Sequence, residues 1–344
     1  MKTIKKRKSH ESDESGDNDY FKIEEYKITN LQSLINLTKD LSNKKEPPKK
    51  KRKKLPKKIY KLIDIIDPLE DLNSLIGLES LKEQLMEQLL FFIQEDFKDN
   101  DMMLHTVIEG PPGTGKTTVA KIMAEIYAGI GIFKKYKFNV IKRNDLIGQY
   151  LGETTYKTME VLEDSINGVI LIDEAYSLGG HKGDNDSYAK EAIDAINEFL
   201  SENKDRIICI IAGYKKELDE CFFKQNPGLR RRFPWTFTIV PYTDVELKDI
   251  FIKMLDETNY ELDDEITDKY IIDSIKKEYF LGNAGDIENL INRMKIISAK
   301  ENFGLEYDKR YIINKKIFDK SFDEFYNKRK EKTLNDNPPF GMYV

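Results

Sequence analysis

The hydrophobic positions of the chain form two patterns, short continuous runs and longer helical spacings, and the short runs stop after residue 241. Between residues 103 and 240, short apolar or β-branched runs alternate with longer segments whose apolar positions recur every three or four residues. Short apolar runs predict buried strands, and the longer period predicts amphipathic helices. The expected strands cover residues 103–109, 137–141, 168–174, 206–212 and 236–240. Strands that alternate with helices predict an α/β fold, with a parallel sheet covered by helices on both faces.

After Pro241 the strand pattern stops and only the helical period continues. The helical spacing before this point covers residues 71–92, with a helix entry expected at Gly77, and residues 117–127, 155–165 and 189–200. The expected helices after this point cover residues 245–255, 267–277, 284–299 and 315–326. The sequence therefore predicts an α/β domain at residues 59–240 and a small all-α lid domain at residues 241–330. The last residues contain Pro338, Pro339 and Gly341, and we expect a flexible tail at residues 331–344.

The two ends of the chain differ in charge. Residues 1–58 hold 18 Lys and Arg against 9 Asp and Glu, whereas the remaining residues hold 38 against 52. The first 58 residues are polar and have no sustained apolar face, so we expect a disordered basic tail with at most a weak helix at residues 28–41. The acidic body and the basic tail are expected to serve different purposes.

A basic cluster from Lys49 to Lys54, between Pro48 and Pro56, is the most distinctive part of this tail. It is typical of a nuclear localisation signal, but a nucleic-acid-binding arm and a solvated linker fit as well. No apolar run approaches the ~20 residues of a membrane helix, and the N-terminus lacks the apolar core of a signal peptide. Two cysteines do not make a disulfide framework. The expected location is intracellular and soluble: nuclear if the cluster is an import signal, and otherwise cytoplasmic.

Candidate chemistry begins with the segment Gly-Pro-Pro-Gly-Thr-Gly-Lys-Thr-Thr, which fits the pattern G-x-x-x-x-G-K-[ST] between an expected strand and an expected helix. Glycines let successive N–H groups point at phosphate oxygens, and the helix N-terminus adds positive potential. Lys116 can reach the outer phosphates, and the Thr117 hydroxyl can bind Mg²⁺. The sequence therefore predicts that the chain binds a nucleoside triphosphate together with Mg²⁺. The loop residues are Gly110, Pro111, Pro112, Gly113, Thr114, Gly115, Lys116, Thr117 and Thr118.

A second motif ends the third expected strand. Four apolar residues lead into Asp173 and Glu174, as in the acidic Walker B strand of ATPases. Asp173 is placed to help hold Mg²⁺, and Glu174 is placed to polarise the attacking water. On its own the segment fits a buried strand that meets a solvated turn. Together with the phosphate loop it predicts ATP hydrolysis.

These motifs, and several others, resemble the AAA+ ATPases of the CbbX/CfxQ and stage V sporulation protein K type, which includes the red-type Rubisco activase. The resemblance covers roughly residues 66–326. Its most specific parts are Asp-Glu-Ala-Tyr-Ser-Leu at residues 173–178 and Ala-Gly-Tyr at residues 212–214. The other matching segments are residues 72–79, 145–152, 226–229 and 282–284.

The resemblance implies further roles. Ile76 and Gly77 would lie near the adenine. Tyr150, Leu151 and Gly152 would form a pore loop that grips a polypeptide at the centre of a homo-oligomeric ring, expected to be a hexamer.

It also implies a catalytic residue that acts between subunits. Arg232 would be the arginine finger that completes the neighbouring subunit's site, with Arg230 and Arg231 as candidates to assist it. A guanidinium supplied in trans stabilises charge in phosphoryl transfer. A solvated basic turn is the alternative interpretation.

Two positions depart from the family pattern. The polar sensor after the fourth strand is replaced by Ala-Gly-Tyr-Lys, which offers only Tyr214 or Lys215. Gly285 stands where relatives commonly carry the arginine of the second sensor, which contacts the γ-phosphate. We therefore expect slow hydrolysis, or a different coupling of hydrolysis to movement of the lid.

The function that fits best is Mg²⁺-dependent ATP hydrolysis by a ring, coupled to remodelling or threading of a protein substrate. A nucleic-acid-associated loader is one alternative, which the basic tail favours and the acidic body opposes. An ATP-binding scaffold with little turnover is another, which Gly285 favours and the pair Asp173–Glu174 opposes.

Overall fold

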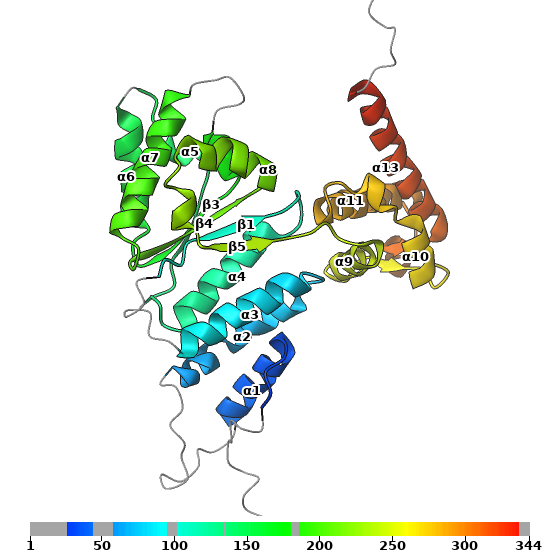
Figure 1. Cartoon of the computed structure of the whole chain (residues 1–344). Helices are drawn as coiled ribbons and strands as arrows, with labels where there is room; N and C mark the ends of the chain where they lie inside the picture. Colours follow the sequence, from blue (N-terminus) through cyan, green and yellow to red (C-terminus); the bar gives the residue numbers. More distant parts are fainter. Residues whose placement is uncertain are drawn as a thin grey trace, which may run out of the picture.

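The computed structural model describes residues 26–43, 58–94, 102–133, 135–150, 152–179 and 186–336. It shows an α/β domain followed by a smaller helical domain (Figure 1). The helices are α1 (Leu31–Asn43), α2 (Ile66–Ser74), α3 (Glu79–Gln94), α4 (Lys116–Gly129), α5 (Arg143–Leu146), α6 (Glu153–Asp164), α7 (Ser187–Glu202), α8 (Lys215–Glu217), α9 (Asp244–Asp256), α10 (Asp268–Ser274), α11 (Ala284–Glu301), α12 (Tyr307–Arg310) and α13 (Lys315–Asp336). The strands are β1 (Thr106–Glu109), β2 (Phe138–Ile141), β3 (Gly168–Ile172), β4 (Ile207–Gly213), β5 (Trp235–Thr238), β6 (Glu261–Leu262) and β7 (Ile312–Ile313).

The α/β domain is built on a five-stranded sheet in the order β2-β3-β4-β1-β5, and every pairing is parallel. Parallel strands end at the same edge of the sheet. The phosphate loop after β1 and the two carboxylates after β3 therefore leave the sheet at one edge, with the end of β4 between them. This arrangement confirms the predicted α/β fold and places the two motifs next to each other.

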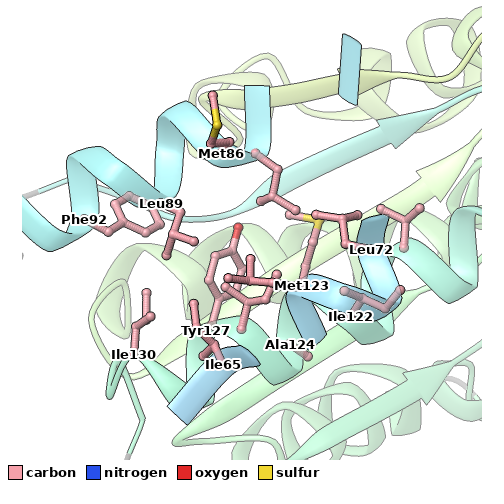
Figure 2. Packing of buried hydrophobic residues seen from close by; sticks show 14 of the residues in the cluster. Ile65, Leu72, Met86, Leu89, Phe92, Ile122, Met123, Ala124, Tyr127 and Ile130 are labelled. Carbon is pink, nitrogen blue, oxygen red and sulfur yellow. The ribbon is translucent and has the colours of Figure 1, made fainter. Parts of the chain in front are cut away.

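Each face of the sheet is covered by helices because the side chains of a strand alternate between its faces. In β4, Ile208 and Ile210 pack with α1–α4, whereas Cys209 and Ile211 pack on the opposite face, which α7 covers (Figure 1). Figure 2 shows the first of these cores, in which Tyr127 of α4 lies among side chains of α2 and α3. Its hydroxyl donates to Gln88 Oε1 at 2.9 Å, so the buried phenol has a partner.

The N-terminal part of the chain corrects the sequence prediction. Residues 26–43 are described, and α1 buries Leu34, Ile35 and Leu37 against α2 and α3 (Figure 1). The expectation that residues 1–58 are disordered is therefore wrong for residues 26–43. The helix that the sequence predicted as weak at residues 28–41 is packed against the core of the α/β domain. A 13-residue helix is marginal alone and needs tertiary packing to form, and that packing comes from residues far along the chain. The basic cluster Lys49–Lys54 lies outside the described residues.

The C-terminal domain, which we call the lid, packs α9, α11 and α13 around one core. It is helical, as expected, apart from a two-residue parallel pairing of β6 with β7. Strands this short produce no readable period in a sequence. The expectation of a loose tail from residue 331 is wrong for residues 331–336, because α13 continues to Asp336. Residues 337–344 lie outside the described part.

Candidate functional site

The phosphate loop has the backbone that its glycines predict. Gly113 and Gly115 adopt φ values of +66° and +82°, a region that glycine occupies at little cost. The Lys116 ammonium donates to the carbonyl of Gly110 at 2.9 Å and to that of Pro111 at 2.6 Å. Burial lowers the pKa of Lys116, and the attraction of Asp173 and Glu174 opposes this shift. The ammonium is thus held at the loop by oxygen atoms that phosphate oxygens can replace.

Asp173, Glu174 and Thr117 meet at the edge of the sheet. The Thr117 hydroxyl donates to Asp173 Oδ2 at 3.1 Å, and Asp173 Oδ1 accepts the Glu174 N–H at 3.0 Å. A hydroxyl and a carboxylate are oxygen ligands of the kind that Mg²⁺ accepts, usually together with water and substrate phosphates. No group of three or more His, Cys, Asp or Glu in the described ranges could hold a metal by itself. The residues present therefore fit a cation that arrives with a phosphate.

Ile76 and Gly77 lie at the junction of the two domains. The segment 71–92, with its predicted helix entry at Gly77, contains two helices: α2 ends at Ser74, and α3 begins at Glu79, after a turn in which Gly77 has φ +65°. A Cβ added to Gly77 would lie 2.2 Å from Glu246 Oε1, and any other residue would be strained at this positive φ. The same added Cβ would lie 3.5 Å from Cε1 of the Tyr242 ring, so the turn packs against this ring. Tyr242 in turn donates its hydroxyl to the Thr114 carbonyl at 3.3 Å, which places the turn beside the phosphate loop.

A turn of the lid also contacts the phosphate loop, through a residue to which sequence reasoning assigned no role. Asn283 is 3% exposed and donates its amide N–H to the Pro112 carbonyl at 3.0 Å. The N–H of Ala284 donates to the Gly113 carbonyl at 3.1 Å. A Cβ at Gly113 would lie 2.0 Å from the Gly282 carbonyl oxygen. The signal in the sequence was Gly-Asn-Ala directly before an expected helix, but its use as a backbone contact depends on the tertiary fold.

Gly285 lies in the first turn of α11, next to this contact. Its amide nitrogen would be 3.0 Å from a Cβ at Gly113. A Cβ built on Gly285 itself meets no atom within 4 Å. The structure thus leaves space for a side chain at the position where an arginine was expected.

Arg232 lies on the side of the sheet where the strands begin, opposite the phosphate loop. Its Nε donates to the Ser201 hydroxyl at 2.7 Å, and Ser201 is in the last turn of α7, just before the chain enters β4. The ring of the next residue, Phe233, is 5.8 Å from that of His105, which precedes β1. Arg232 is therefore at the edge where the strands begin, whereas the phosphate loop is where they end.

The neighbouring arginines are exposed. The Arg230 guanidinium lies 4.4 Å from the centroid of the Phe223 ring and 3.5 Å from Asp219 Oδ1. Arg231 is also exposed. The three arginines form a short 3₁₀ turn (Arg230–Arg232), so their side chains point in different directions.

The predicted pore-loop segment lies between α5 and α6. Tyr150 is 69% exposed, and Gly152 has φ +88°, while Leu151 lies outside the described residues. The Glu153 carboxylate accepts the N–H groups of Gln149 and Tyr150, each at 3.2 Å. The first turn of α6 thus holds the loop, and the Tyr150 ring is available to a partner.

Of the two candidates for the missing polar sensor, Lys215 is engaged elsewhere. Its Nζ lies 3.0 Å from Glu109 Oε1, and this buried carboxylate also accepts the Thr238 hydroxyl at 2.7 Å. Lys215 thereby ties the end of β4 to β1 and β5. Tyr214 is the candidate that faces the phosphate loop, since the Lys116 ammonium lies 5.2 Å from its ring centroid.

Comparisons with known proteins agree with this geometry. The profile of the ATPase family associated with various cellular activities (AAA) matches residues 106–235. The chain is 36% identical over 286 residues to a cfxQ-like protein of Acanthamoeba polyphaga mimivirus, which covers 81% of this chain and 69% of that protein. It is 35% identical over 245 residues to CbbX of Cereibacter sphaeroides, covering 68% of this chain and 78% of the relative. It is 34% identical over 255 residues to the chloroplastic ribulose bisphosphate carboxylase/oxygenase activase of Cyanidioschyzon merolae, covering 71% of this chain and 86% of the relative.

A solved structure shares the fold at low sequence identity. The FIGL-1 AAA domain in complex with ADP superposes with a TM-score of 0.54 and 19% identity, over 76% of this chain and 89% of that one. In the part of the chain that the structure covers, no helix is long and apolar enough to span a bilayer.

Proposed function

The chain belongs to the CbbX/CfxQ-like AAA+ ATPases, and we propose that it hydrolyses Mg²⁺-bound ATP as a ring of identical subunits in order to remodel a protein substrate. The observation that carries the proposal is the convergence of the two motifs at one edge of the sheet. Thr117 and Asp173 are hydrogen-bonded at 3.1 Å, and Lys116 and Glu174 lie on either side of them in the sequence. Binding and hydrolysis are thus supported by groups of the same subunit.

Each of these groups has a separate task. The N–H groups of the loop and the Lys116 ammonium bind the phosphates, while Thr117 and Asp173 hold the cation, which neutralises charge on the phosphates. Glu174 is exposed, as a residue that must reach water is expected to be, and orients the attacking water. Ile76, Gly77 and the adjoining Tyr242 border the space in which the adenine binds.

Arg232 acts on the neighbouring subunit's nucleotide. β4 has seven residues, which span roughly 23 Å at about 3.3 Å each, and Arg232 lies near the start of this strand. An arginine side chain is much shorter than this length, so Arg232 cannot serve the phosphate loop of its own subunit. A ring in which each subunit presents this edge to the next one gives the guanidinium a phosphate to contact, as an arginine finger does.

A protein is the substrate class that the surface favours. Tyr150 is an exposed aromatic whose backbone N–H is bonded to Glu153 of α6, and such a ring can contact polypeptide side chains of many kinds. The body of the chain holds 38 basic against 52 acidic residues after residue 58, which opposes a channel for nucleic acid. The resemblance to a Rubisco activase names no substrate for this chain.

The test has two arms. Steady-state ATP hydrolysis by the full chain is measured with and without Mg²⁺, and with and without single- and double-stranded DNA. We expect Mg²⁺-dependent turnover that DNA does not change. Stimulation by DNA would favour the nucleic-acid loader, and ATP binding without turnover would favour the scaffold.

The second arm looks for the substrate. Glu174→Gln is crosslinked in cells with its bound proteins and compared with Lys116→Ala, which should not bind ATP. Proteins enriched on the first variant and absent from the second are candidate substrates, since the first should hold them in the ATP state. Equal recovery on both variants would contradict ATP-dependent capture.

A further inference from the structure

The turn of the lid that contacts the phosphate loop has an unfavourable backbone conformation. This lid turn covers residues 280–286, and its Asn283 has φ +50° and ψ −125°, outside the regions that residues other than glycine ordinarily occupy. Such a backbone persists only where the surrounding structure holds it. The hydrogen bonds of Asn283 and Ala284 to the carbonyls of Pro112 and Gly113 therefore depend on the groups that hold the lid turn.

Asp286 holds the turn from within the lid. Its side chain is 6% exposed, and its Oδ2 accepts the N–H of Gly282 at 2.6 Å. A Cβ at Gly282 would lie 2.8 Å from Asp286 Oδ1 and 3.0 Å from Oδ2, so glycine lets the carboxylate lie directly against the backbone. Asp286 thereby fixes the orientation of Gly282, whose carbonyl oxygen packs against Gly113.

The charge of this buried carboxylate is paired by the C-terminal helix. Arg329 of α13 donates from Nη2 to Asp286 Oδ1, and α13 lies along α11 (Figure 1). A buried carboxylate is unfavourable unless it is paired and hydrogen-bonded. The position that Asp286 takes against the lid turn therefore depends on a residue 43 positions later in the chain.

The same helix also holds the first residue of the lid turn. Phe325 stacks on Phe280, with ring centroids 4.8 Å apart and planes inclined by 23°. Phe280 is 2% exposed, and its carbonyl accepts the N–H of Asn283 at 2.9 Å. The Arg329 guanidinium lies 5.4 Å from the centroid of the Phe325 ring, one helical turn earlier. Two residues of α13 at i and i+4 thus contact the lid turn at its two ends.

We propose that Asp286 and Arg329 are positioning residues for ATP binding, and that α13 acts through them to hold the lid turn against the phosphate loop. Without the ion pair, the lid turn relaxes from its strained conformation and loses its hydrogen bonds to the loop. The groups at the ends of the strands are not touched by this change. The inference rests on the ATPase function proposed above, and it adds the C-terminal helix to the parts of the chain that set ATP affinity.

The first test removes the charge of Arg329 and keeps most of its apolar stem. Arg329→Met should raise the Kd for ATP with Mg²⁺ about 10-fold, the equivalent of one hydrogen bond to a charged group. Calorimetry in a Glu174→Gln background measures this affinity while the nucleotide stays intact. With Glu174 present, the KM should rise while kcat stays within about twofold, as for a lost binding contact. Arg329→Lys keeps the charge and should retain about half of the affinity.

The second test asks whether Arg329 acts through Asp286. Asp286→Asn removes the buried charge but keeps an oxygen for the N–H of Gly282. In this background Arg329→Met should change ATP affinity less than about twofold, because two residues that act through one contact are not additive.

A second ion pair between the same two helices provides the matched control. Arg293 of α11 donates to Glu324 of α13, and neither residue contacts the phosphate loop or the lid turn in the interactions given above. Arg293→Met should leave ATP affinity unchanged, even where the Tm measured without nucleotide falls.

Three results would overturn the inference alone: normal ATP affinity in Arg329→Met, equal losses from Arg329→Met and Arg293→Met, or the same loss from Arg329→Met with Asp286 and with asparagine at that position. A fall in kcat without a rise in KM would also overturn it, because Arg329 would then act in the chemistry. ATP binding by the wild-type chain tests the proposed function separately, and its absence would overturn both.

Discussion

The nucleotide site has two sides that are built on different principles. The sheet side presents charged and polar side chains on consecutive residues, Lys116 with Thr117 and Asp173 with Glu174. The lid side presents a tight turn, in which Asn283 and the N–H of Ala284 contact carbonyls of the phosphate loop. No charged side chain comes from position 285, where the family commonly has one. In the proposed function the sheet side therefore supplies the reacting groups, and the lid side covers the phosphate loop.

The difference separates two tasks of such a site, which are acting on the phosphates and covering the loop that binds them. Charges that act on phosphate must lie within a few ångströms of it, so they come from the ends of neighbouring strands, which the sheet keeps in register. Closure needs only complementary backbone, and a turn with a glycine on each partner allows that approach: Gly113 and Gly282 come so close that a Cβ would not fit. With Gly285 in the lid, the proposed ring makes the γ-phosphate depend on Arg232 of the neighbouring subunit for its guanidinium.

The largest expected effect tests this dependence. Arg232→Ala should bind ATP nearly as the wild type does, yet hydrolyse it ~10³-fold more slowly, the usual loss for an arginine finger. Turnover and ATP affinity are measured on rings checked by light scattering. Arg231→Ala is the matched control from the same turn and should lose far less. A monomer that hydrolyses ATP at the full rate would contradict the shared site.

Mixing two inactive variants sharpens the same point. Arg232→Ala and Glu174→Gln subunits should together recover part of the turnover, because some interfaces join an intact Glu174 to an intact Arg232. The readout is ATP hydrolysis across mixing ratios. No recovery at any ratio, in rings shown to be mixed, would place Arg232 outside the neighbour's site.

The next effect belongs to the sheet side alone. Glu174→Gln should bind ATP and assemble normally but hydrolyse it at least ~10²-fold more slowly, as expected for loss of a general base. Lys116→Ala should instead lose ATP binding itself, as calorimetry would show, with the fold retained. Unchanged turnover in the first variant would move the catalytic role to another residue, and normal affinity in the second would contradict the role of the loop.

A smaller effect is expected from the lid turn. Asn283→Gly keeps a backbone that tolerates φ +50° but removes the amide that bonds to Pro112. ATP affinity should fall about 10-fold, the equivalent of one or two hydrogen bonds, while hydrolysis of bound ATP changes little. Asn289→Ala, on an exposed position of the same helix, is the control. A loss confined to kcat would mean that this turn takes part in the chemistry after all.

Restoring the missing charge should have a severalfold effect in the opposite direction. Gly285→Arg places a guanidinium where a Cβ meets no other atom within 4 Å, and turnover should rise because the γ-phosphate gains a second cation. Gly285→Ala controls for the helix propensity gained when glycine is replaced. If both variants behave as the wild type does, the lid does not reach the γ-phosphate.

The last prediction compares the two domains by stability rather than activity. Burial, with a smaller contribution from the Arg232 charge, lowers the pKa of His105 to about 4 from 6.5. Between these values the unfolded chain binds a proton that the native chain does not. The free energy of unfolding should therefore fall as pH drops from 6.5 to 4, by up to ~3 kcal/mol. Urea unfolding across this range should show a weaker pH dependence in His105→Gln, and the histidine-free lid (residues 241–330) should lack this component.

The sequence by itself determined the parts of this protein that depend on local pattern. The alternation of apolar runs with helical periods identified all five strands of the main sheet, to within a few residues. The phosphate loop and the acidic strand were readable because each motif is continuous and lies next to the element that positions it. The same reasoning placed Arg232 on a turn after the fourth strand, although its partner Ser201 and its distance from the phosphate loop follow only from the fold.

The tertiary structure decided everything that depends on residues distant in the chain. The sequence prediction assigned α1 to a disordered tail because polar and basic segments flank it, whereas the structure buries its apolar side against α2 and α3. The apolar spacing of residues 71–92 placed a helix entry at Gly77 but did not show that a separate helix, α2, precedes it, and the positive φ values of Gly77 and Leu78 separate α2 from α3. The stacking of the Tyr176 and Tyr214 rings, whose centroids are 5.1 Å apart, and the contact of Asn283 with Pro112 leave no trace in local periodicity. They arise because a sheet brings strand ends together regardless of their order in the sequence, and because a lid folds back onto a loop 171 residues earlier.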